Sequence, residues 1–347
     1  MLTIAIANQK GGCGKTTTAV NMSAALAAVG RKVLLIDLDP QAHASFALRK
    51  SSQPPGRFIY DVLIDNAERR SPFDSCITNI SVNLDMVQAS IELSTLEQEL
   101  KDKEDAVSQL HKTLLSCPPA YEYVLVDCPP SLGFLTFNAL RAADRVIIPI
   151  DMSPFTLVGV GKLLGMLELV GTKLGHFPRV SALATLFDKR TTYSGEILDE
   201  VKTFFGDRML RTIIRHNVAL KRAVSEGISV IDFDKTCTGA RDYAALSDEI
   251  LRLGPIDSSE PDAREAAFTI EAPAARDVYV VGDFNEWKIG DESRLVNTGN
   301  AWWEKRMKLA RGRYRYQFVV DGEWTPDSKN GERERNVFGT FDSIVAI

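Results

Sequence analysis

A run of glycines and lysines near the N-terminus has the composition of a phosphate-binding loop. Residues 10–17, KGGCGKTT, follow a short apolar run and precede a helical pattern. Glycines let backbone N–H groups curl around phosphate oxygens, and the N-terminus of a helix adds a favourable dipole. We expect Lys15 to reach the β- and γ-phosphates and the Thr16 hydroxyl to ligate Mg²⁺. The residues expected to bind the nucleotide are Gly11, Gly12, Cys13, Gly14, Lys15, Thr16 and Thr17.

An acidic residue ends a second apolar run, 123–127, with the sequence YVLVD. Burying the Asp127 carboxylate there is costly unless the carboxylate is paired or lies near a cation. Mg²⁺ supplies that cation, and we expect Asp127 to reach the metal through a water molecule.

The five cysteines are scattered without a CxxC pair, which favours a reducing cytoplasm over a disulfide framework.

Short Val- and Ile-rich runs alternate with helical stretches over the first 254 residues. Such alternation predicts an α/β fold, a parallel sheet with helices on both faces. The expected helices are 16–29, 93–115 and 157–174, and the expected strands are 2–7, 32–38, 123–127, 145–150, 180–187 and 209–215.

Composition divides the 347-residue chain near residue 255. All five cysteines precede this point and all four tryptophans follow it. We therefore predict a domain over 1–254, a linker over 255–264 and a second domain over 265–347. The net charge of −5 does not favour nucleic acid in bulk, so any contact with DNA needs a local basic patch. Neither a signal peptide nor a membrane span is visible, and no membrane partner is expected.

The second domain has the alternating pattern of a small antiparallel sandwich. The runs 277–281, 302–309 and 314–320 are separated by turn residues such as Asp321-Gly322. Alternation places Trp303, Met307 and Leu309 in the core. It also directs Tyr314, Tyr316 and Phe318 inward and Gln317 outward.

The phosphate-binding loop, with a second lysine at its start, resembles the deviant Walker A motif of the ParA/MinD superfamily of ATPases. Residues 34–41, LLIDLDPQ, look like the switch segment of that family, and 123–133 look like its Walker B strand and the following loop. The resemblance covers residues 1 to about 253 and is closest to the partitioning ParA branch. It implies that Lys10 reaches the ATP of a partner subunit, Asp39 positions the attacking water and Asn217 contacts adenine. The implied catalytic residues are Lys10, Lys15, Asp39 and Asp127.

This resemblance also implies cofactors and partners. They are ATP and Mg²⁺, an ATP-dependent homodimer, slow hydrolysis stimulated by a ParB-like protein, and non-specific DNA in the nucleoid of the cytoplasm. Arg190 matches a DNA-binding arginine of the family, whereas a second such arginine falls at Ala219. Arg215, Lys221 and Arg222 surround that position and are the other candidate phosphate contacts, although they could also form an ordinary solvated surface.

The second domain resembles the glycogen-binding module of the AMP-activated kinase beta subunit and the isoamylase N-terminal domain, an immunoglobulin-like sandwich. The sequences GDFNEW at 282–287, YRYQFVVDGEW at 314–324 and FGTFDSIVAI at 338–347 carry this resemblance. It implies an α-glucan platform of Trp287 and Trp324, with Gln317, Thr340 and Asp342 as polar neighbours. That family usually has lysine at the position of Gln317 and asparagine at that of Asp342.

Three functions remain open on the sequence alone. The first is a nucleotide-switched ATPase that partitions or positions DNA or other cargo. The second is an ATP-regulated adaptor that binds glycogen, or a polysaccharide-handling enzyme, through the second domain. A metabolic P-loop ligase is the third, but no additional substrate motif supports it.

Overall fold

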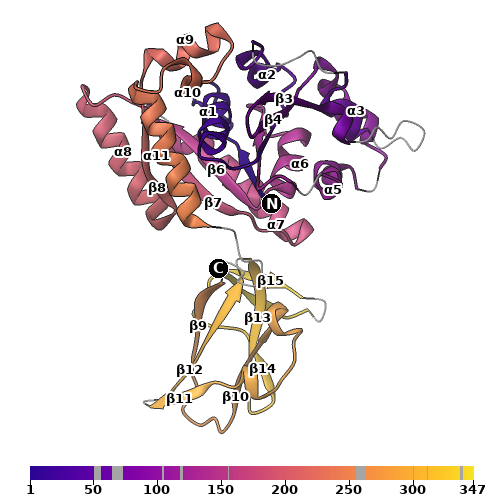
Figure 1. Cartoon of the computed structure of the whole chain (residues 1–347). Helices are drawn as coiled ribbons and strands as arrows, with labels where there is room; N and C mark the ends of the chain where they lie inside the picture. The colour runs from indigo at the N-terminus through magenta and orange to yellow at the C-terminus, as the bar shows by residue number, and fades with distance from the viewer. Residues whose placement is uncertain are drawn as a thin grey trace. The chain divides into compact units, whose positions relative to one another are not determined.

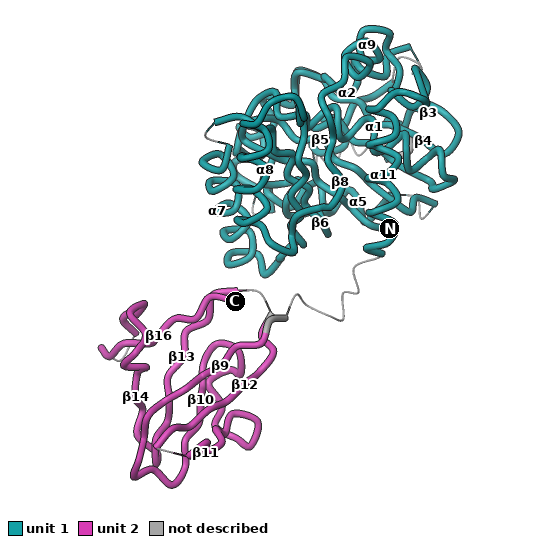
Figure 2. The backbone as a smooth tube through the Cα atoms, turned by 90° about the vertical axis from the view of Figure 1, so that its left-hand side faces the viewer, with its two compact units in different colours: residues 1–256 teal, residues 257–347 magenta. Residues whose placement is uncertain are grey.

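The computed structural model describes residues 1–50, 56–64, 73–103, 105–117, 120–154, 156–254, 263–299, 301–310, 312–336 and 339–347. The chain forms two compact units, residues 1–256 and 257–347 (Figure 2), and each is described by itself. Residues 255–262 of the predicted linker lie outside the described residues. Among the described residues, no helix is long and apolar enough to cross a membrane.

The first unit is built on an eight-stranded sheet with the order β3-β4-β2-β5-β1-β6-β7-β8 (Figure 1). The six predicted strands are present, and neighbouring ones run parallel. The sequence patterns missed β3 and β4, which pair antiparallel at one edge. The strands are β1 (Leu2–Ile6), β2 (Val33–Asp37), β3 (Ile77–Ser81), β4 (Leu84–Val87), β5 (Tyr123–Asp127), β6 (Arg145–Asp151), β7 (Arg179–Phe187) and β8 (Met209–Arg215).

Helices cover both faces of this sheet because its strands are apolar on both sides. In β1, for example, Ile4 and Ile6 join one core cluster while Ala5 joins the other. One face packs against α1 (Lys15–Ala28), α2 (His43–Ala47), α9 (Val218–Glu226), α10 (Val230–Phe233) and α11 (Thr238–Leu253). The other face packs against α3 (Ile59–Leu63), α4 (Leu96–Leu100), α5 (Gln109–Leu115), α6 (Phe134–Ala142), α7 (Thr156–Leu174) and α8 (Thr192–Phe205).

The helix predicted over 93–115 is wrong in extent. The structure divides that stretch into α4 and α5, with short 3₁₀ turns at Ile91–Ser94 and Ala106–Ser108. The charged run at 101–105, KDKED, offers no apolar side chain to bury. The buried Leu100 and Leu110 therefore anchor two short helices in place of one long helix.

The second unit is the predicted antiparallel β-sandwich. One sheet has the order β10-β13-β16-β15, with β14 paired to β13, and the other has the order β11-β12-β9. Trp303, Tyr316 and Phe318 lie in its core as predicted, with Met307 partly buried against it. The strands are β9 (Ala263–Glu271), β10 (Val278–Gly282), β11 (Val296–Gly299), β12 (Trp302–Ala310), β13 (Arg313–Val320), β14 (Glu323–Thr325), β15 (Arg333–Arg335) and β16 (Phe341–Ala346).

Candidate nucleotide site and carbohydrate pocket

The glycine-rich loop joins the end of β1 to the start of α1. Gly12 and Gly14 have φ of 76° and 90°, a conformation that glycine adopts without strain. No atom lies within 4 Å of where a Cβ on Gly11 or Gly12 would stand, so the loop borders open space, as a phosphate cradle must. The first amides of α1 have no side-chain cap, which leaves them available to an anion. Lys15 is buried beside them, and its Nζ donates to the Lys10 carbonyl oxygen at 2.9 Å.

Two carboxylates meet at the ends of neighbouring strands, because Asp37 of β2 pairs in register with Asp127 of β5. Both are fully buried, and neither oxygen of Asp127 has a hydrogen-bond partner among the described residues. Burial, together with the neighbouring charge of Asp37, raises the pKa of Asp127 well above its usual range. Two orphaned carboxylate oxygens fit a cation, so Thr16 and Asp127 are suited to hold Mg²⁺. No cluster of three or more metal-ligating side chains occurs in the described parts of the chain.

Asp37 was missed at the sequence level, although its run VLLID ends on a carboxylate just as YVLVD does. Its Oδ2 accepts hydrogen bonds from the Ser45 amide at 2.8 Å and the Ser45 hydroxyl at 2.7 Å. Burial raises the pKa of Asp37 to about 6 despite these donors. Asp37 thus anchors the start of α2 beside Asp127.

Asp39 and Lys10 lie on the loops that follow β2 and β1. Asp39 is buried, and its Oδ1 accepts from the Gln41 amide at 2.9 Å. Lys10 turns its Nζ toward the end of β6, where it lies 2.9 Å from Asp151 Oδ2 and donates to the Ser153 hydroxyl. Neither Asp151 nor Ser153 was predicted from the sequence, where the only signal was a carboxylate directly after the apolar run 145–150.

The side chain of Asn217 caps α9, because its Oδ1 accepts from the Ala219 amide at 2.7 Å. No described residue accepts from its Nδ2, so that group is available to a ligand and the adenine contact stays a prediction. Cys13 is buried, and its carbonyl oxygen accepts from the Thr185 hydroxyl at 2.8 Å. Burial raises the pKa of the Cys13 and Cys128 thiols, so both favour the protonated, unreactive form.

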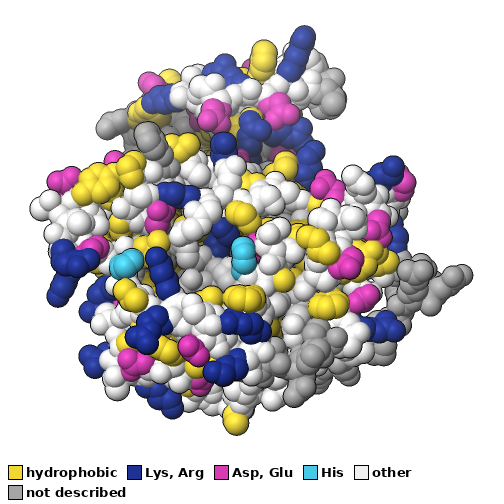
Figure 3. Space-filling view, turned by 90° about the horizontal axis from the view of Figure 1, so that it is seen from above, with side chains coloured by type: hydrophobic (Ala, Val, Ile, Leu, Met, Phe, Trp, Pro, Cys, Tyr) yellow, Lys and Arg dark blue, Asp and Glu magenta, His cyan; other side chains and the backbone are white. Residues whose placement is uncertain are grey.

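The four basic residues proposed for DNA differ in how they are held. Arg190 is exposed but paired with Asp188, Nε to Oδ1 at 2.9 Å, and Arg215 Nε lies 3.1 Å from Oδ1 of the buried Asp242. Lys221 and Arg222 are exposed on α9. Within the described residues neither forms an ion pair, and the Arg222 guanidinium lies 5.5 Å from the ring centre of Phe233. Figure 3 shows Lys and Arg side chains interspersed with acidic and hydrophobic ones over one face of the molecule, without one continuous basic patch.

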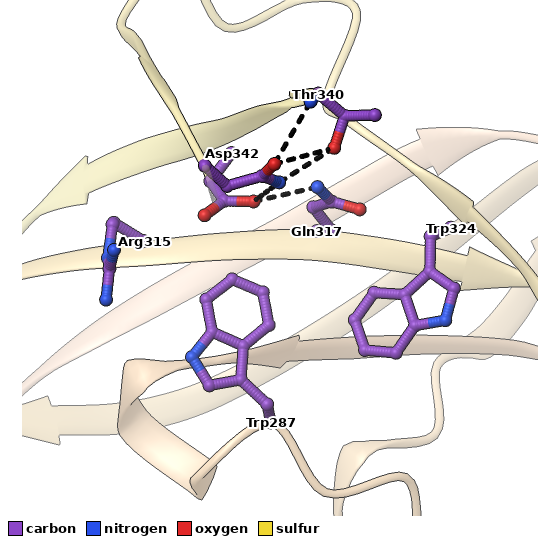
Figure 4. A pocket seen from close by; sticks show the side chains of 7 residues that line it. Trp287, Arg315, Gln317, Trp324, Thr340 and Asp342 are labelled. Carbon is purple, nitrogen blue, oxygen red and sulfur yellow. Dashed lines mark hydrogen bonds between the residues drawn. The ribbon is translucent and has the colours of Figure 1, made fainter. Parts of the chain in front are cut away.

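The five predicted carbohydrate residues all line one pocket of about 740 Å³ in the second unit. The ring centres of Trp287 and Trp324 lie 6.2 Å apart with the planes tilted by 32° (Figure 4). Trp324 is 51% exposed, so the pocket presents an aromatic surface to solvent. The sequence analysis missed two lining residues, Arg315 and Asn336.

The polar wall of the pocket is a closed hydrogen-bond network (Figure 4). Asp342 Oδ1 accepts from Gln317 Nε2 and from Asn336 Nδ2, each at 2.8 Å. Asn336 also donates to the Thr340 hydroxyl and accepts from the Thr340 amide. Gln317 faces away from the core as predicted, yet it is only 4% exposed because this network covers it.

Asp283 fixes the other side of the pocket by binding Arg315 and Trp287 together. Its Oδ1 accepts from Trp287 Nε1 at 3.1 Å, and its Oδ2 accepts from the Arg315 amide at 2.9 Å. Trp287 has φ of 59°, an uncommon left-handed conformation for a bulky residue.

Two family models match separate parts of the chain. A family model described as an AAA domain matches residues 1–177. A second model, described as the glycogen recognition site of AMP-activated protein kinase, matches residues 267–347.

Individual relatives match the first unit over nearly their full length. The chain is 39% identical to the chromosome-partitioning ATPase Soj of Treponema pallidum over 72% of this chain and 96% of that protein. It is 38% identical to the chromosome partitioning protein ParA of Caulobacter vibrioides over 72% of this chain and 93% of that protein.

A solved structure, cobyrinic acid a,c-diamide synthase from Mycobacterium smegmatis with bound ADP and magnesium, superposes with a TM-score of 0.63 at 30% identity. It covers 73% of this chain and 94% of that chain. The partitioning proteins are more similar in sequence than this synthase. The chain therefore belongs to the Soj/ParA family of ATPases, with a C-terminal unit that resembles a glycogen recognition module.

Proposed function

We propose that the protein is an ATP-dependent dimerising ATPase that acts as a nucleotide switch to partition or position DNA or other cargo. Its cofactors are ATP and Mg²⁺. The observation that carries this proposal is the fully buried carboxylate of Asp127, whose oxygens have no hydrogen-bond partner among the described residues. Asp127 ends β5 and pairs with Ile6 at the end of β1, after which the phosphate loop leads into α1. A buried carboxylate without partners is costly to the fold unless a bound cation completes it.

Residues of the phosphate loop and of the neighbouring strand ends have separate roles in the reaction. Lys15 and the amides of the glycine-rich loop bind the phosphates, and Thr16 with Asp127 holds Mg²⁺, which neutralises charge on the transferred phosphoryl group. Asp39 orients the attacking water. Lys10 serves the ATP of the partner subunit, so full activity requires a dimer. Hydrolysis is slow until a partner protein stimulates it.

The test uses two variants that separate dimer formation from hydrolysis. Lys10→Ala retains ATP binding but forms a weaker ATP-dependent dimer with impaired hydrolysis, whereas Asp39→Ala accumulates as an ATP-bound dimer. Dimerisation is measured by analytical ultracentrifugation with ATP and Mg²⁺, and hydrolysis by phosphate release. Equal dimerisation and turnover in Lys10→Ala and the unmodified protein would contradict the role of Lys10 in trans. Normal hydrolysis by Asp39→Ala would mean that another group positions the attacking water.

The partners follow from the family. The ATP-bound dimer binds non-specific duplex DNA, and a ParB-like protein stimulates hydrolysis, which places the protein in the cytoplasm on the nucleoid. Arg190 and Arg215 are already paired with carboxylates, so Lys221 and Arg222 of α9 are the strongest candidates for phosphate contacts. A partner encoded by a neighbouring gene would identify the cargo.

A second function, binding of an α-glucan, is supported by the pocket of the C-terminal unit. Two tryptophan rings tilted by 32° follow a curved chain of sugar rings better than a flat one. Sugar sites combine such apolar stacking with a few fixed polar groups, which the Asp342 network supplies. This ATP-regulated adaptor would deliver the ATPase to glycogen or to an enzyme that handles it.

Titration calorimetry of the full chain with maltoheptaose, and with cellohexaose as the matched flat ligand, tests the second function. We expect weak binding of maltoheptaose that is nearly insensitive to salt, since stacking carries no net charge. A folded protein that binds neither oligosaccharide would overturn glucan binding and favour docking of a protein at the same tryptophans.

A further inference from the structure

Lys10 is held within its own chain both at its backbone and at its ammonium group. Its backbone amide donates to Asn8 Oδ1 at 3.1 Å, and its carbonyl oxygen accepts from Lys15 Nζ at 2.9 Å. Its ammonium group lies against Asp151 and Ser153, 141 and 143 residues later in the chain. The side chain is therefore anchored within its own subunit.

The Asp151 carboxylate is a prepared partner for this ammonium group. Its side chain is 14% exposed, and its second oxygen, Oδ1, accepts from the Thr156 hydroxyl at 3.2 Å. Ser153 donates to the Oδ2 that also receives Lys10, at 2.6 Å. Partial burial works against the charged carboxylate, but the hydrogen bonds from Lys10 and Ser153 outweigh it and lower the pKa of Asp151. Asp151 consequently stays ionised at neutral pH.

We propose that Asp151 is a positioning residue that retains Lys10 within its own subunit and thereby sets how readily the ATP-bound dimer forms. The inference rests on the proposed role of Lys10 in trans. One ammonium group cannot bind Asp151 and a phosphate of the partner's nucleotide at full strength together, so the two anions compete for it. Asp151 thus opposes assembly until nucleotide in the partner offers a stronger acceptor.

The position of Asp151 on β6 allows its effect on dimerisation to be separated from effects of the strand as a whole. Asp151 ends β6 on the carboxyl-terminal side of the sheet, four residues beyond Ile147, which pairs with Ile6 of β1. Asp144 stands before the first residue of the strand and accepts from the Thr3 amide at 2.7 Å. A seven-residue strand separates the two carboxylates by roughly 20 Å, so Asp144 provides a matched control on the same element.

The test compares Asp151→Asn with Asp144→Asn in the full chain. The dissociation constant of the dimer is measured by analytical ultracentrifugation with Mg²⁺ and AMPPNP, which is not hydrolysed. Loss of a hydrogen-bonded charge pair is expected to tighten the Asp151→Asn dimer about tenfold. Asp144→Asn is expected to leave the constant unchanged, and the unfolding temperature of each variant is recorded beside it.

A double-mutant cycle then shows whether Asp151 acts through Lys10. In a Lys10→Ala background, Asp151→Asn is expected to have no further effect on dimerisation. An equal effect in both backgrounds would overturn the proposal, since Asp151 would then act through the fold. A weaker dimer in Asp151→Asn would also overturn it, because Asp151 would then direct Lys10 toward the partner. Dimerisation that is indifferent to Lys10→Ala alone would instead refute the role in trans on which the inference rests.

Discussion

The two units of the chain hold their functional polar groups in opposite ways. At the phosphate loop, Asp127 is buried with both carboxylate oxygens unpaired, and the first amides of α1 have no side-chain cap. In the pocket of the sandwich, Asp342 is also buried, but Gln317 and Asn336 both donate to it. The first site is incomplete without its ligand, whereas the second is complete before any ligand arrives.

This difference predicts how each unit responds to its ligand. An unpaired buried carboxylate reduces the stability of the fold, and a bound cation restores it, so nucleotide with Mg²⁺ should stabilise the first unit strongly. A preorganised pocket gains little stability from a weak sugar ligand, and its affinity depends on the aromatic surface that stays exposed. Substitutions at the two sites can therefore separate stability from binding.

The largest effect is expected from Lys15→Ala. This variant removes a buried ammonium group from the phosphate loop, so ATP affinity should fall by at least about 100-fold, given 1.5–3 kcal/mol for each charge-assisted hydrogen bond. The rise in unfolding temperature on addition of ATP and Mg²⁺ should disappear with it. Lys162→Ala, which changes an exposed lysine of α7, is the matched control. Retention of ATP binding by Lys15→Ala would remove this loop from the nucleotide site.

The next effect concerns the tryptophans of the second unit. Trp287→Ala and Trp324→Ala should each lower maltoheptaose affinity roughly thirtyfold, at about 25 cal/mol per Å² of apolar surface covered by the sugar. Trp302→Ala is the control, because Trp302 lies outside the pocket with Lys329 Nζ 3.6 Å from its ring centre. Calorimetry measures all three variants, and equal losses in all of them would refute the assigned platform.

Trp303→Ala separates the core from the binding surface. Trp303 is 7% exposed, and its Nε1 donates to the Ala272 carbonyl oxygen at 3.1 Å. Its removal should destabilise the sandwich by about 3–5 kcal/mol through a cavity. Circular dichroism during thermal unfolding distinguishes this loss of fold from the loss of binding expected at Trp287.

The parts of a site that lie close together along the chain can be predicted from the sequence, and the parts that lie far apart cannot. The phosphate loop occupies eight consecutive residues, and the glycines and lysines that its chemistry needs can be recognised in order. Asp37 gains its meaning only from its register with Asp127, and Asp151 only from a fold that brings it to Lys10. No local periodicity encodes contacts between residues 90 or 141 positions apart.

The pocket of the sandwich shows the same limit on a smaller scale. Arg315 stands two residues before Gln317 on β13, so strand alternation could have placed both on one face. Asn336 follows β15 and is held by hydrogen bonds with Thr340, which no pattern of apolar residues predicts. Strand alternation could therefore have predicted Arg315, whereas no sequence pattern predicts the position of Asn336.

A smaller effect is expected at the candidate DNA surface. Replacing Lys221 and Arg222 together by Ala should weaken ATP-dependent binding to every duplex and reduce the salt dependence by about two units, one for each lost phosphate contact. Arg190→Ala should change the slope less, since its guanidinium already pairs with Asp188. The control replaces Lys162 and Lys173, two exposed lysines of α7. An unchanged slope in the α9 variant would exclude Lys221 and Arg222 from the interface.

The smallest changes in stability without ligands should come from one isosteric change made at both buried carboxylates. Asp127→Asn removes a carboxyl group whose pKa is raised by burial and by the charge of Asp37, so at neutral pH and without Mg²⁺ the variant should unfold at a higher temperature than the unmodified protein. It should also lose most of the stabilisation by Mg²⁺ and ATP. Calorimetric unfolding with and without both ligands measures the two changes.

Asp342→Asn should change neither the stability of the second unit nor its ligand binding. The oxygen of the new amide still accepts from Gln317 and Asn336, so stability should stay within about 0.5 kcal/mol and maltoheptaose affinity within about threefold. A large gain in stability from Asp342→Asn would mean that this carboxylate is held at a cost, as at Asp127. An Asp127→Asn variant that unfolds earlier than the unmodified protein without ligands would mean that its carboxylate is satisfied within the fold, and the contrast between the two sites would fail.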